Sequence, residues 1–488
     1  MKLLYITSEA QPLVKTGGLA DVSGALPQAL KLRRVDVRLL LPAYRGVVER
    51  AGKVRVVAEL SGLGLPVRLL QATLPGSGVP VWLVDCPPLF DRPGGPYVAA
   101  DGSDWPDNAE RFALFCRVAV RVALDRAGLR WRPEVVHCHD WQTGLVPALL
   151  DGQAERPRTV FTIHNLAYQG DFPAATFDRL NLPAPLWSPH GLEFYGRLAF
   201  IKGGLAFADR LTTVSPTYAR DICTADYGHG LDGLLRHRAA VLSGILNGVD
   251  YGAWDPAVDP HLARPFGPTT LPRRQVNKAA LQHAFGLPEK PEVPLVTHIG
   301  RLAWQKGGDL IADALPELLT GHVQCIVLGS GDAALERRLI ELARHYPTQL
   351  AVRIGYDEAL AHQIEGGADL FLMPSRYEPC GLNQIYSLRY GCVPVVRRTG
   401  GLADTVVDAT PHALRAGIAT GVVFEEASVW GILEALRRTL AIYWDRKRAW
   451  RQLQRTGMAQ DFSWDESARE YVRLYREVVR VGAARQVP

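Results

Sequence analysis

Short apolar runs rich in Val, Ile and Leu alternate with helix-like segments along most of this 488-residue chain. Such runs are typical of strands buried on both faces, as in parallel sheets covered by helices. In the first half we expect strands at KLLYIT, VDVRLLLP, VPVWLVD, EVVHCH, TVFTIH and RLTTVS. The pattern starts again at LVTHIG, VQCIVLG, AVRIG, LFLMPS and VPVVRR. The chain is therefore predicted to be an α/β protein whose pattern occurs twice.

The length of the chain indicates more than one domain, since domains usually contain about 100 to 200 residues. Periodicity lapses over residues 247–272, where Pro, Gly and Asp are dense, and a boundary fits there best. We predict a first domain over residues 1–246 and a second over residues 247–465. Residues 466–488 should form a C-terminal helix that packs back toward the first domain.

Composition and charge exclude several classes of protein. The 55 basic and 50 acidic residues give a net charge of +5 and are scattered, which argues against a nucleic-acid partner. No apolar run is long enough for a signal peptide or for the roughly 18 residues of a membrane span. The seven cysteines are widely spaced and odd in number, which favours a reducing compartment. We expect a cytoplasmic protein without a membrane partner.

One six-residue segment, TGGLAD, occurs at residues 16–21 and again at residues 399–404. Both copies follow a predicted strand and open a predicted helix. Paired glycines allow a tight turn that brings backbone N–H groups near a ligand, and a helix N-terminus favours an anion. For the glycines alone, a coincidence of common turn chemistry is the simpler interpretation. One copy in each predicted domain favours a ligand site at a cleft instead.

Lysine is scarce, with nine among the 55 basic residues, so its placement is informative. Lys15, Lys202 and Lys306 each precede a glycine pair, but the surroundings of Lys202 indicate a packed helix. Lys306 lies in GRLAWQKG, a predicted loop after the strand LVTHIG that also contains Arg301. Ligands of parallel sheets bind beyond the carboxyl ends of strands, so Arg301 and Lys306 are predicted to clamp a diphosphate.

The segment PSRYEPCGL follows the predicted strand LFLMPS directly. The amides of Gly381 and Leu382, at the start of the next helix, could bind phosphate oxygens while Glu378 faces the neighbouring group. An acid in a first helical turn also simply complements the helix dipole. That alternative does not explain why Glu-Pro-Cys-Gly follows a strand so closely.

Histidines in the first half suggest two kinds of site. His137 and His139 share a strand face, but no paired Cys or His motif completes a set of four zinc ligands, so no metal is expected. His164 ends the strand TVFTIH. A lone histidine is more often structural, yet its position at a carboxyl end favours contact with substrate.

At KTGGLADV, GRLAWQKG, PSRYEPCGLNQIYSLRYG and RRTGGLADT the sequence closely resembles the bacterial glycogen synthases, within the ADP-glucose-dependent glycogen and starch synthase family. HDW, TIHN and LNGVD match as well, and the resemblance runs through nearly the whole chain. It implies a GT-B fold of two Rossmann-like domains with the active site in the interdomain cleft. The implied reaction is retaining transfer of glucose from ADP-glucose to the non-reducing end of an α-1,4-glucan, with no metal and no cofactor.

The resemblance also implies roles for single residues. The residues implied to act in catalysis are Arg301, Lys306, Glu378 and His164. Those implied to bind the donor are Lys15, Gly17, Gly18, Asp21, Asn247, Tyr356, Cys380, Gly381, Leu382, Thr399 and Gly400, with Tyr356 in the adenine-stacking position. Those implied on the acceptor side are Glu9, Tyr97, Asp140, Trp141 and Asn165.

The implied chemistry needs cations at the diphosphate and acceptors near the sugar, because ADP leaves as an anion while the sugar gains positive character. Retention without an evident nucleophile suggests front-face attack within an ion pair, with a leaving phosphate oxygen taking the proton of the acceptor. Glu378 would then orient and stabilise the sugar without a covalent bond.

Three other functions are compatible with parts of this pattern. Glycogen phosphorylase shares the architecture but needs pyridoxal phosphate on a lysine and a longer chain. A non-catalytic glucan-binding protein predicts aromatic platforms without a phosphate clamp, and Arg301, Lys306 and Glu378 argue against it. A sugar-nucleotide epimerase would leave glucan length unchanged. Elongation of a glucan with ADP-glucose or UDP-glucose is the assay that separates these functions.

Overall fold

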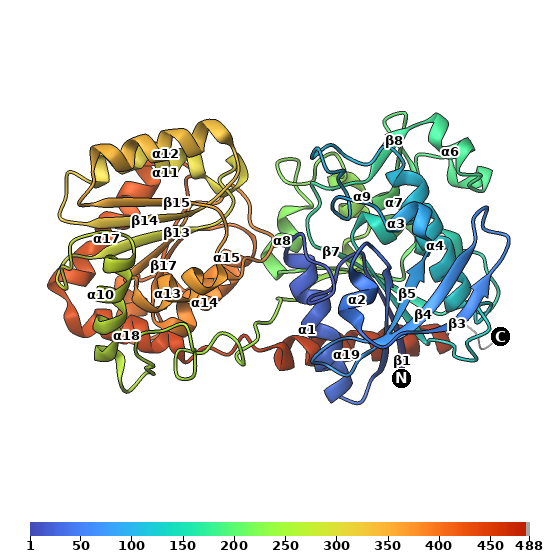
Figure 1. Cartoon of the computed structure of the whole chain (residues 1–488), viewed down its shortest axis with the longest axis horizontal. Helices are drawn as coiled ribbons and strands as arrows, with labels where there is room; N and C mark the ends of the chain where they lie inside the picture. Colours follow the sequence, from blue (N-terminus) through green and yellow to red (C-terminus); the bar gives the residue numbers. More distant parts are fainter. Residues whose placement is uncertain (485–488) are drawn as a thin grey trace. The chain divides into compact units, whose positions relative to one another are not determined.

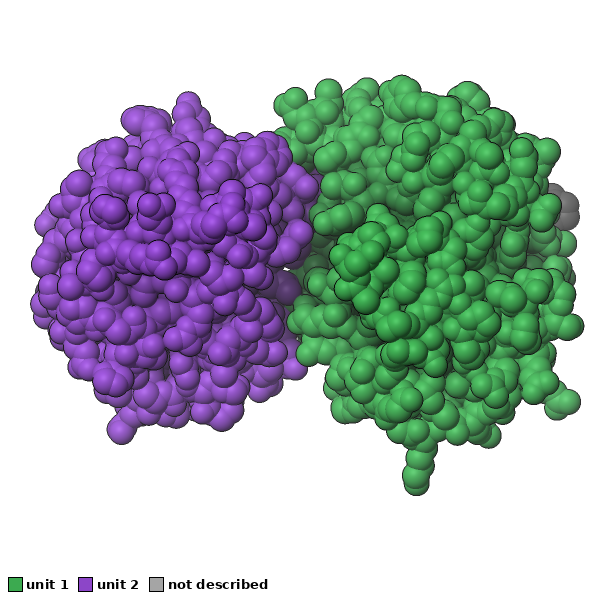
Figure 2. All heavy atoms as spheres, turned by 45° about the horizontal axis from the view of Figure 1, so that its top comes forward, with its two compact units in different colours: residues 1–214, 219–248, 464–488 green, residues 215–218, 249–463 purple. Residues whose placement is uncertain are grey.

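The computed structural model describes the backbone of residues 1–484 and the side chains of residues 1–480 (Figure 1). The chain divides into two compact units, which Figure 2 distinguishes by colour. Unit 1 comprises Met1–Val214, Ala219–Gly248 and the chain from Trp464 onward, and unit 2 comprises Ser215–Tyr218 and Val249–Ser463. The main divisions lie within two residues of the sequence-based boundaries. The assignment of Ser215–Tyr218 to unit 2 has no counterpart in the sequence pattern.

Among the described residues, unit 1 contains a nine-stranded sheet in the order β12-β11-β7-β6-β1-β2-β5-β4-β3. The strands from β12 to β5 run parallel, whereas β3 and β4 are antiparallel to their neighbours. The strands are β1 (Lys2–Ile6), β2 (Asp36–Pro42), β3 (Arg55–Leu60), β4 (Val67–Thr73), β5 (Pro80–Asp85), β6 (Val135–His139), β7 (Arg158–Ile163), β11 (Arg210–Thr213) and β12 (Leu242–Gly244). The sequence pattern predicted the parallel strands apart from β12 and missed the antiparallel edge.

Helices and a small antiparallel sheet complete unit 1. The small sheet has the order β8-β10-β9, formed by Asp171–Pro173, Arg197–Ala199 and Glu193–Phe194. The helices are α1 (Gly18–Leu32), α2 (Val47–Ala51), α3 (Pro87–Phe90), α4 (Asn108–Ala123), α5 (Leu145–Leu150), α6 (Ala175–Arg179), α7 (Phe200–Phe207), α9 (Asp232–His237) and α19 (Trp464–Ala484), and α8 (Pro216–Asp221) spans a boundary between the units.

The C-terminal helix α19 is an integral part of unit 1. It packs on α1, and its Tyr471 and Tyr475 are buried. At its start, the Ser467 hydroxyl donates to the carbonyl of Leu246 over 2.7 Å. The apolar face of α19 therefore covers the sheet of unit 1, as its helical periodicity suggests.

Unit 2, all of whose residues are described, contains a six-stranded parallel sheet in the order β15-β14-β13-β16-β17-β18. Its strands are β13 (Leu295–Ile299), β14 (Gln324–Gly329), β15 (Leu350–Ile354), β16 (Leu370–Met373), β17 (Val393–Arg397) and β18 (Val422–Phe424). Its helices are α10 (Arg274–Ala284), α11 (Gly308–Leu318), α12 (Ala333–His345), α13 (Glu358–Gly367), α14 (Asn383–Tyr390), α15 (Gly400–Thr405), α16 (Pro411–Ala416), α17 (Val429–Asp445) and α18 (Lys447–Met458).

Apolar cores lie on both faces of the unit 2 sheet. One core joins β14 and β16 residues to α11 and α17, through side chains such as Ile311 and Leu436. The other joins Leu295 and Phe371 to α13. A parallel sheet with helices on both faces confirms the predicted α/β class. Within residues 1–484, no helix combines the length and apolarity that crossing a membrane requires.

Candidate active site

In unit 2, the structure brings two predicted catalytic residues into direct contact. Lys306 follows β13 in a single helical turn (Trp304–Lys306), and Glu378 follows the adjacent strand β16. The Lys306 Nζ lies 2.5 Å from the Glu378 Oε2, and the Ser375 hydroxyl donates to the same oxygen over 3.2 Å. The sequence assigned Lys306 to a diphosphate and Glu378 to a sugar. The structure adds that the two charged groups pair with each other.

The loop that contains Arg301 is tied to the loop that contains Glu378. Arg301 donates to the side-chain oxygen of Gln305 over 3.1 Å, and the side-chain nitrogen of Gln305 donates to the Tyr377 carbonyl over 3.3 Å. Arg376 binds Asp309 through two hydrogen bonds of 2.7 Å, and the Arg376 amide donates to the Gln305 carbonyl. Arg376 lies in the segment PSRYEPCGL and had no predicted role. These contacts fix the spacing between the predicted cation loop and Glu378.

The second TGGLAD copy lies against the Glu378 segment. The Gly401 amide donates to the Glu378 carbonyl over 3.0 Å. A Cβ atom on Gly400 would lie 2.0 Å from the Glu378 carbonyl oxygen, and one on Gly401 would lie 2.0 Å from the Cys380 carbonyl oxygen. Gly400 also has a φ of +43°, a conformation that L side chains rarely adopt. The glycines here therefore permit a close approach between two protein segments.

The remaining predicted donor residues of unit 2 lie near the carboxyl ends of the strands. Cys380 is buried, Gly381 has a φ of +73°, and Leu382 precedes α14, whose first turn has no side-chain cap. The hydroxyl oxygen of Thr399 is buried without a partner among the described residues. Tyr356, two residues beyond β15, is 71% exposed.

One further residue of this region, His298, had no role in the sequence analysis. It lies within β13, and its Nδ1 donates to the Leu372 carbonyl over 2.9 Å. Burial lowers the pKa of His298 to about 4, and the charge of Lys306 contributes in the same direction. His298 is therefore neutral at neutral pH. Its place near the end of LVTHIG was the only signal in the sequence.

In unit 1, the first TGGLAD copy is organised by Glu9. The amides of Thr16 and Gly17 both donate to the Glu9 Oε2, the latter over 3.1 Å. The Tyr97 hydroxyl donates to the other carboxylate oxygen over 2.6 Å. The structure thus joins Glu9 and Tyr97 to the glycine loop and corrects the expectation that these loop amides face a ligand. An internal carboxylate, not an external anion, accepts their hydrogen bonds.

The neighbouring charges of this loop are paired. Lys15 lies 2.7 Å from the Asp21 carboxylate, across the first turn of α1. Beside them, a Cβ atom placed on Gly17 or Gly18 would meet no heavy atom within 4 Å. Open space next to the loop is compatible with the predicted contact between this loop and a donor.

The residues that were predicted to bind the sugar and the acceptor include several that follow β6 and β7. The His164 amide donates to the Asp140 Oδ1 over 2.7 Å, and burial raises the pKa of the Asp140 carboxyl to about 7. The Asn165 side chain accepts from the Ala167 amide. Trp141 packs edge-on against Phe112, Phe172 and Phe200. Trp141 is 9% exposed and supports the aromatic core more than it offers a platform.

Asn247, the last residue predicted to contact the sugar, lies near the end of the segment Ala219–Gly248 of unit 1. It is buried, and its Oδ1 has no partner among the described residues. A buried amide oxygen without a partner is costly unless a ligand or water donates to it. This feature is compatible with the predicted contact to a sugar hydroxyl.

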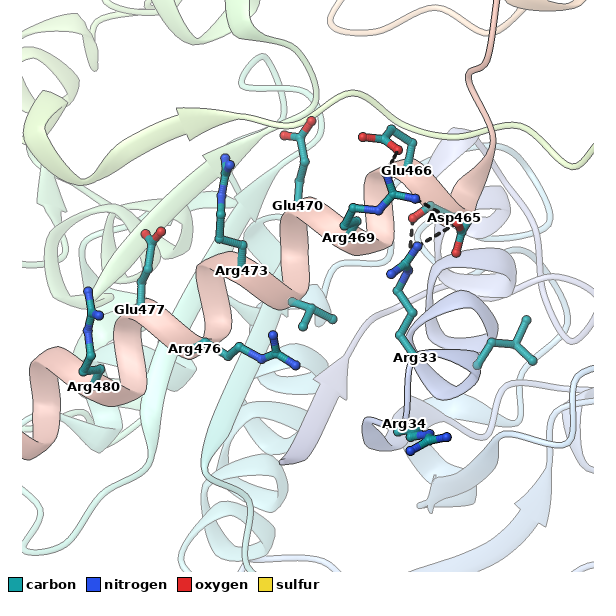
Figure 3. A pocket seen from close by; sticks show the side chains of 12 residues that line it. Arg33, Arg34, Asp465, Glu466, Arg469, Glu470, Arg473, Arg476, Glu477 and Arg480 are labelled. Carbon is teal, nitrogen blue, oxygen red and sulfur yellow. Dashed lines mark hydrogen bonds and ion pairs between the residues drawn. The ribbon is translucent and has the colours of Figure 1, made fainter.

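A separate groove of about 930 Å³ lies between the C-terminal end of α1 and α19 (Figure 3). Arg33 lies 2.7 Å from Asp465, and Arg469 lies 2.6 Å from Glu466 along its wall. None of the predicted site residues lines this groove. The described residues also contain no group of three His, Cys, Asp or Glu side chains that could hold a metal ion.

Comparison with known proteins identifies the class and the family. The family model for the starch synthase catalytic domain matches residues 2–237, and the model for group 1 glycosyl transferases matches residues 281–455. The structure of the catalytic domain of starch synthase IV from Arabidopsis thaliana, bound to ADP and acarbose, is similar with a TM-score of 0.87 and 33% identity. That similarity covers 98% of this chain and 99% of the other. The chain is thus a glycosyltransferase with the two-domain GT-B fold.

Sequence relatives place it further within that class. It is 58% identical to the glycogen synthase of Thioalkalivibrio sulfidiphilus, over 98% of this chain and all of the relative. It is 57% identical to glycogen synthase 1 of Methylococcus capsulatus, over 98% of this chain and 97% of the relative. The chain belongs to the bacterial glycogen synthase family, and the family resemblance inferred from its motifs is confirmed.

Proposed function

We propose that this enzyme transfers glucose from ADP-glucose to the non-reducing end of an α-1,4-glucan with retention at the anomeric carbon. The observation that carries the proposal is the Lys306–Glu378 pair, which joins a cation and a carboxylate at adjacent strand ends. The names of the relatives and the ADP bound to the starch synthase support the donor.

Unit 2 supplies the groups that a nucleotide diphosphate sugar requires. Arg301 and Lys306 would bind the diphosphate, together with the amides at the start of α14. The exposed ring of Tyr356 would stack on the adenine. On donor binding, Lys306 would contact the distal phosphate while keeping its contact with Glu378, so that one cation links the leaving group to the carboxylate.

The chemical step separates charge, and the paired residues match that separation. As the bond between the sugar and ADP breaks, Arg301 and Lys306 stabilise the negative charge on the phosphate, and Glu378 stabilises the positive character of the sugar. The acceptor hydroxyl attacks from the face that ADP leaves, and its proton passes to the leaving phosphate oxygen. The new glycosidic bond therefore has the configuration of the donor.

Unit 1 would contribute the remaining contacts. His164 and Asn247 would bind the glucose, and Glu9 and Tyr97 would shape the acceptor side together with Asp140. Lys15 and the first glycine loop would approach the donor from unit 1. Action of both units on one donor molecule, in the implied interdomain cleft, stays a prediction.

We further propose a cytoplasmic location and a reaction without a cofactor. All seven cysteines are free thiols, which fits a reducing compartment. Arg301 and Lys306 can supply the positive charge that the leaving diphosphate needs. The net charge of +5 offers little attraction for nucleic acid, so the expected partners are ADP-glucose and the glucan.

The test is elongation of a glucan primer by the purified chain with radiolabelled ADP-glucose or UDP-glucose. We expect label in the glucan with ADP-glucose, a far lower kcat/KM with UDP-glucose, and release of the label by an exo-hydrolase specific for α-1,4 bonds. Lys306→Ala should weaken elongation, whereas Lys290→Ala, at an exposed lysine of the same unit, should not. Equal use of both donors, or label outside the glucan, would contradict the proposal.

A further inference from the structure

Two histidines of unit 1 face each other where β6 and β7 end. His139 is the last residue of β6, and His164 directly follows β7, its neighbour in the sheet. The His139 Nδ1 lies 2.9 Å from the His164 Nε2. His139 is fully buried, and its ring stacks on Tyr5 with ring centres 4.1 Å apart. The core therefore holds this contact next to His164, the residue predicted to bind the sugar.

Both imidazoles are neutral at neutral pH. Burial lowers the pKa of His139 well below its ordinary value. His164 keeps part of its surface exposed, but the protein atoms around its ring lower its pKa to about 3. Two neutral rings at hydrogen-bond distance share one proton between the facing nitrogens. The tautomer of one ring therefore determines the tautomer of the other.

The environment of His139 indicates which nitrogen carries that proton. Its second nitrogen, Nε2, is buried and has no partner among the described residues. A proton on Nε2 would leave a buried N–H without an acceptor, and such orphan donors are rare in folded proteins. A proton on Nδ1 is instead donated to His164. The His164 Nε2 must then accept, so its own proton lies on Nδ1.

We propose that His139 is a positioning residue that fixes the tautomer of His164, so that His164 offers its Nδ1–H to a hydroxyl oxygen of the donor sugar. The proposal rests on the proposed function for the identity of the ligand, but the tautomer itself does not depend on it. In this state His164 is a hydrogen-bond donor and cannot take a proton from the acceptor through Nδ1. This fits a reaction in which the leaving phosphate takes that proton.

A neighbouring histidine provides a contrast within the same core. The rings of His137 and His139 lie 4.0 Å apart, yet both nitrogens of His137 have partners. Its Nε2 lies 2.6 Å from the Thr162 hydroxyl, and its Nδ1 lies 2.8 Å from the Tyr475 hydroxyl of α19. Tyr475→Phe therefore removes a buried hydrogen bond in this core without touching the His139–His164 pair.

The direct test is nitrogen NMR of the full chain labelled with 15N in its histidine rings, with His164→Gln used to assign the His164 signals. We expect the His164 Nδ1 to carry the proton and the Nε2 to be unprotonated, although free imidazole side chains favour the reverse. A proton on the His164 Nε2 would overturn the proposal. This result is read without substrate, so it is independent of whether the proposed reaction is correct.

Substitutions at His139 extend the test. His139→Asn places an amide N–H where Nδ1–H was, and should keep the His164 tautomer. His139→Asp places an acceptor there, and should move the His164 proton to Nε2. We expect kcat of His139→Asp to be about tenfold or more below that of His139→Asn, with Tyr475→Phe near the unmodified enzyme. Equal kcat in the two His139 variants, with the tautomer changed, would contradict a role in turnover. If His139→Asp does not fold, the tautomer of the unmodified chain still decides.

Discussion

The two copies of TGGLAD have identical sequences and opposite surroundings. In unit 1, the amides of Thr16 and Gly17 donate to the carboxylate of Glu9, and open space adjoins the glycines. In unit 2, Gly400 and Gly401 lie against the backbone, where a Cβ atom on either would be 2.0 Å from a carbonyl oxygen. Glycine is thus required for space in the second copy and not in the first.

The aspartates that end the two copies differ in the same way. Asp21 pairs with Lys15 of its own loop over 2.7 Å. Asp404 accepts from the amide and the hydroxyl of Thr217, over 2.8 and 2.6 Å. A repeated turn sequence therefore predicts a strand, a turn and a helix, but its neighbours decide what the turn contacts. The first copy binds the carboxylate of Glu9 through its amides, and the second contacts the backbone of Glu378.

The largest effect should come from Glu378, whose backbone carbonyl the second copy contacts. Glu378→Gln keeps the size of the residue but removes its charge, so kcat should fall about 100-fold to 1,000-fold. ADP should bind nearly as well, because Arg301, Lys306 and the α14 amides remain. Lys306→Ala should weaken ADP binding as well as turnover, since the diphosphate is charged before and during departure. Glucan elongation gives kcat, and calorimetry gives ADP affinity.

A control within the same unit is Glu365→Gln. Burial raises the pKa of Glu365 to about 8, so this carboxyl is mostly protonated at neutral pH and the amide resembles it. Its kcat should stay close to that of the unmodified enzyme. Near-normal turnover in Glu378→Gln would remove Glu378 from the catalytic residues and leave the second copy with a purely structural role.

The next effect compares the glycines themselves. Gly401→Ala places a Cβ atom 2.0 Å from the Cys380 carbonyl oxygen, so the backbone must move. Overpacking of this kind costs about 1 to 3 kcal/mol of the free energy of unfolding. The movement should also displace Glu378 and lower kcat. Gly17→Ala meets no atom within 4 Å and should change stability by about 0.5 kcal/mol or less. Urea unfolding of both variants decides; equal losses would show that the two turns do not differ.

The sequence predicts a strand or a contact of the site only where the pattern that produces it is local in the chain. Strands such as β1 and β14, with almost wholly buried side chains, are predictable because their residues are apolar throughout. β3 has a single buried residue, and β18 has only three residues, so neither stands out. The proximity of Lys306 and Glu378 was predictable because adjacent parallel strands end at one edge. The contact between Glu9 and the loop amides was not, because it depends on the path of the chain between them.

That unpredicted contact gives a third, smaller effect. Glu9→Gln replaces a carboxylate that accepts two amide hydrogen bonds with a side chain that carries an N–H group, which cannot accept from Thr16, Gly17 or Tyr97. Loss of a hydrogen bond to a charged group costs about 1.5 to 3 kcal/mol, and rotation of the amide should recover part of it. We expect a net loss of about 1 to 2 kcal/mol and a raised KM for the glucan. An unchanged KM for the glucan would contradict a role of the first glycine loop in binding the acceptor.

The smallest effect is a pH dependence near the second copy. His298 has a pKa of about 4 in the folded protein, compared with 6.5 for an unperturbed histidine. The unfolded chain therefore binds a proton as the pH falls below about 6.5, while folded His298 does not until about 4, so stability is lost over this range. The loss attributable to one such histidine is about 1.4 kcal/mol for each pH unit at most.

His298→Asn keeps a donor for the Leu372 carbonyl but does not titrate. Between pH 6 and pH 5, the free energy of unfolding should fall about 1 kcal/mol less in this variant than in the unmodified chain. Urea unfolding at the two pH values measures both falls. Equal falls in the two proteins would mean that folded His298 takes up its proton at the same pH as the unfolded chain does.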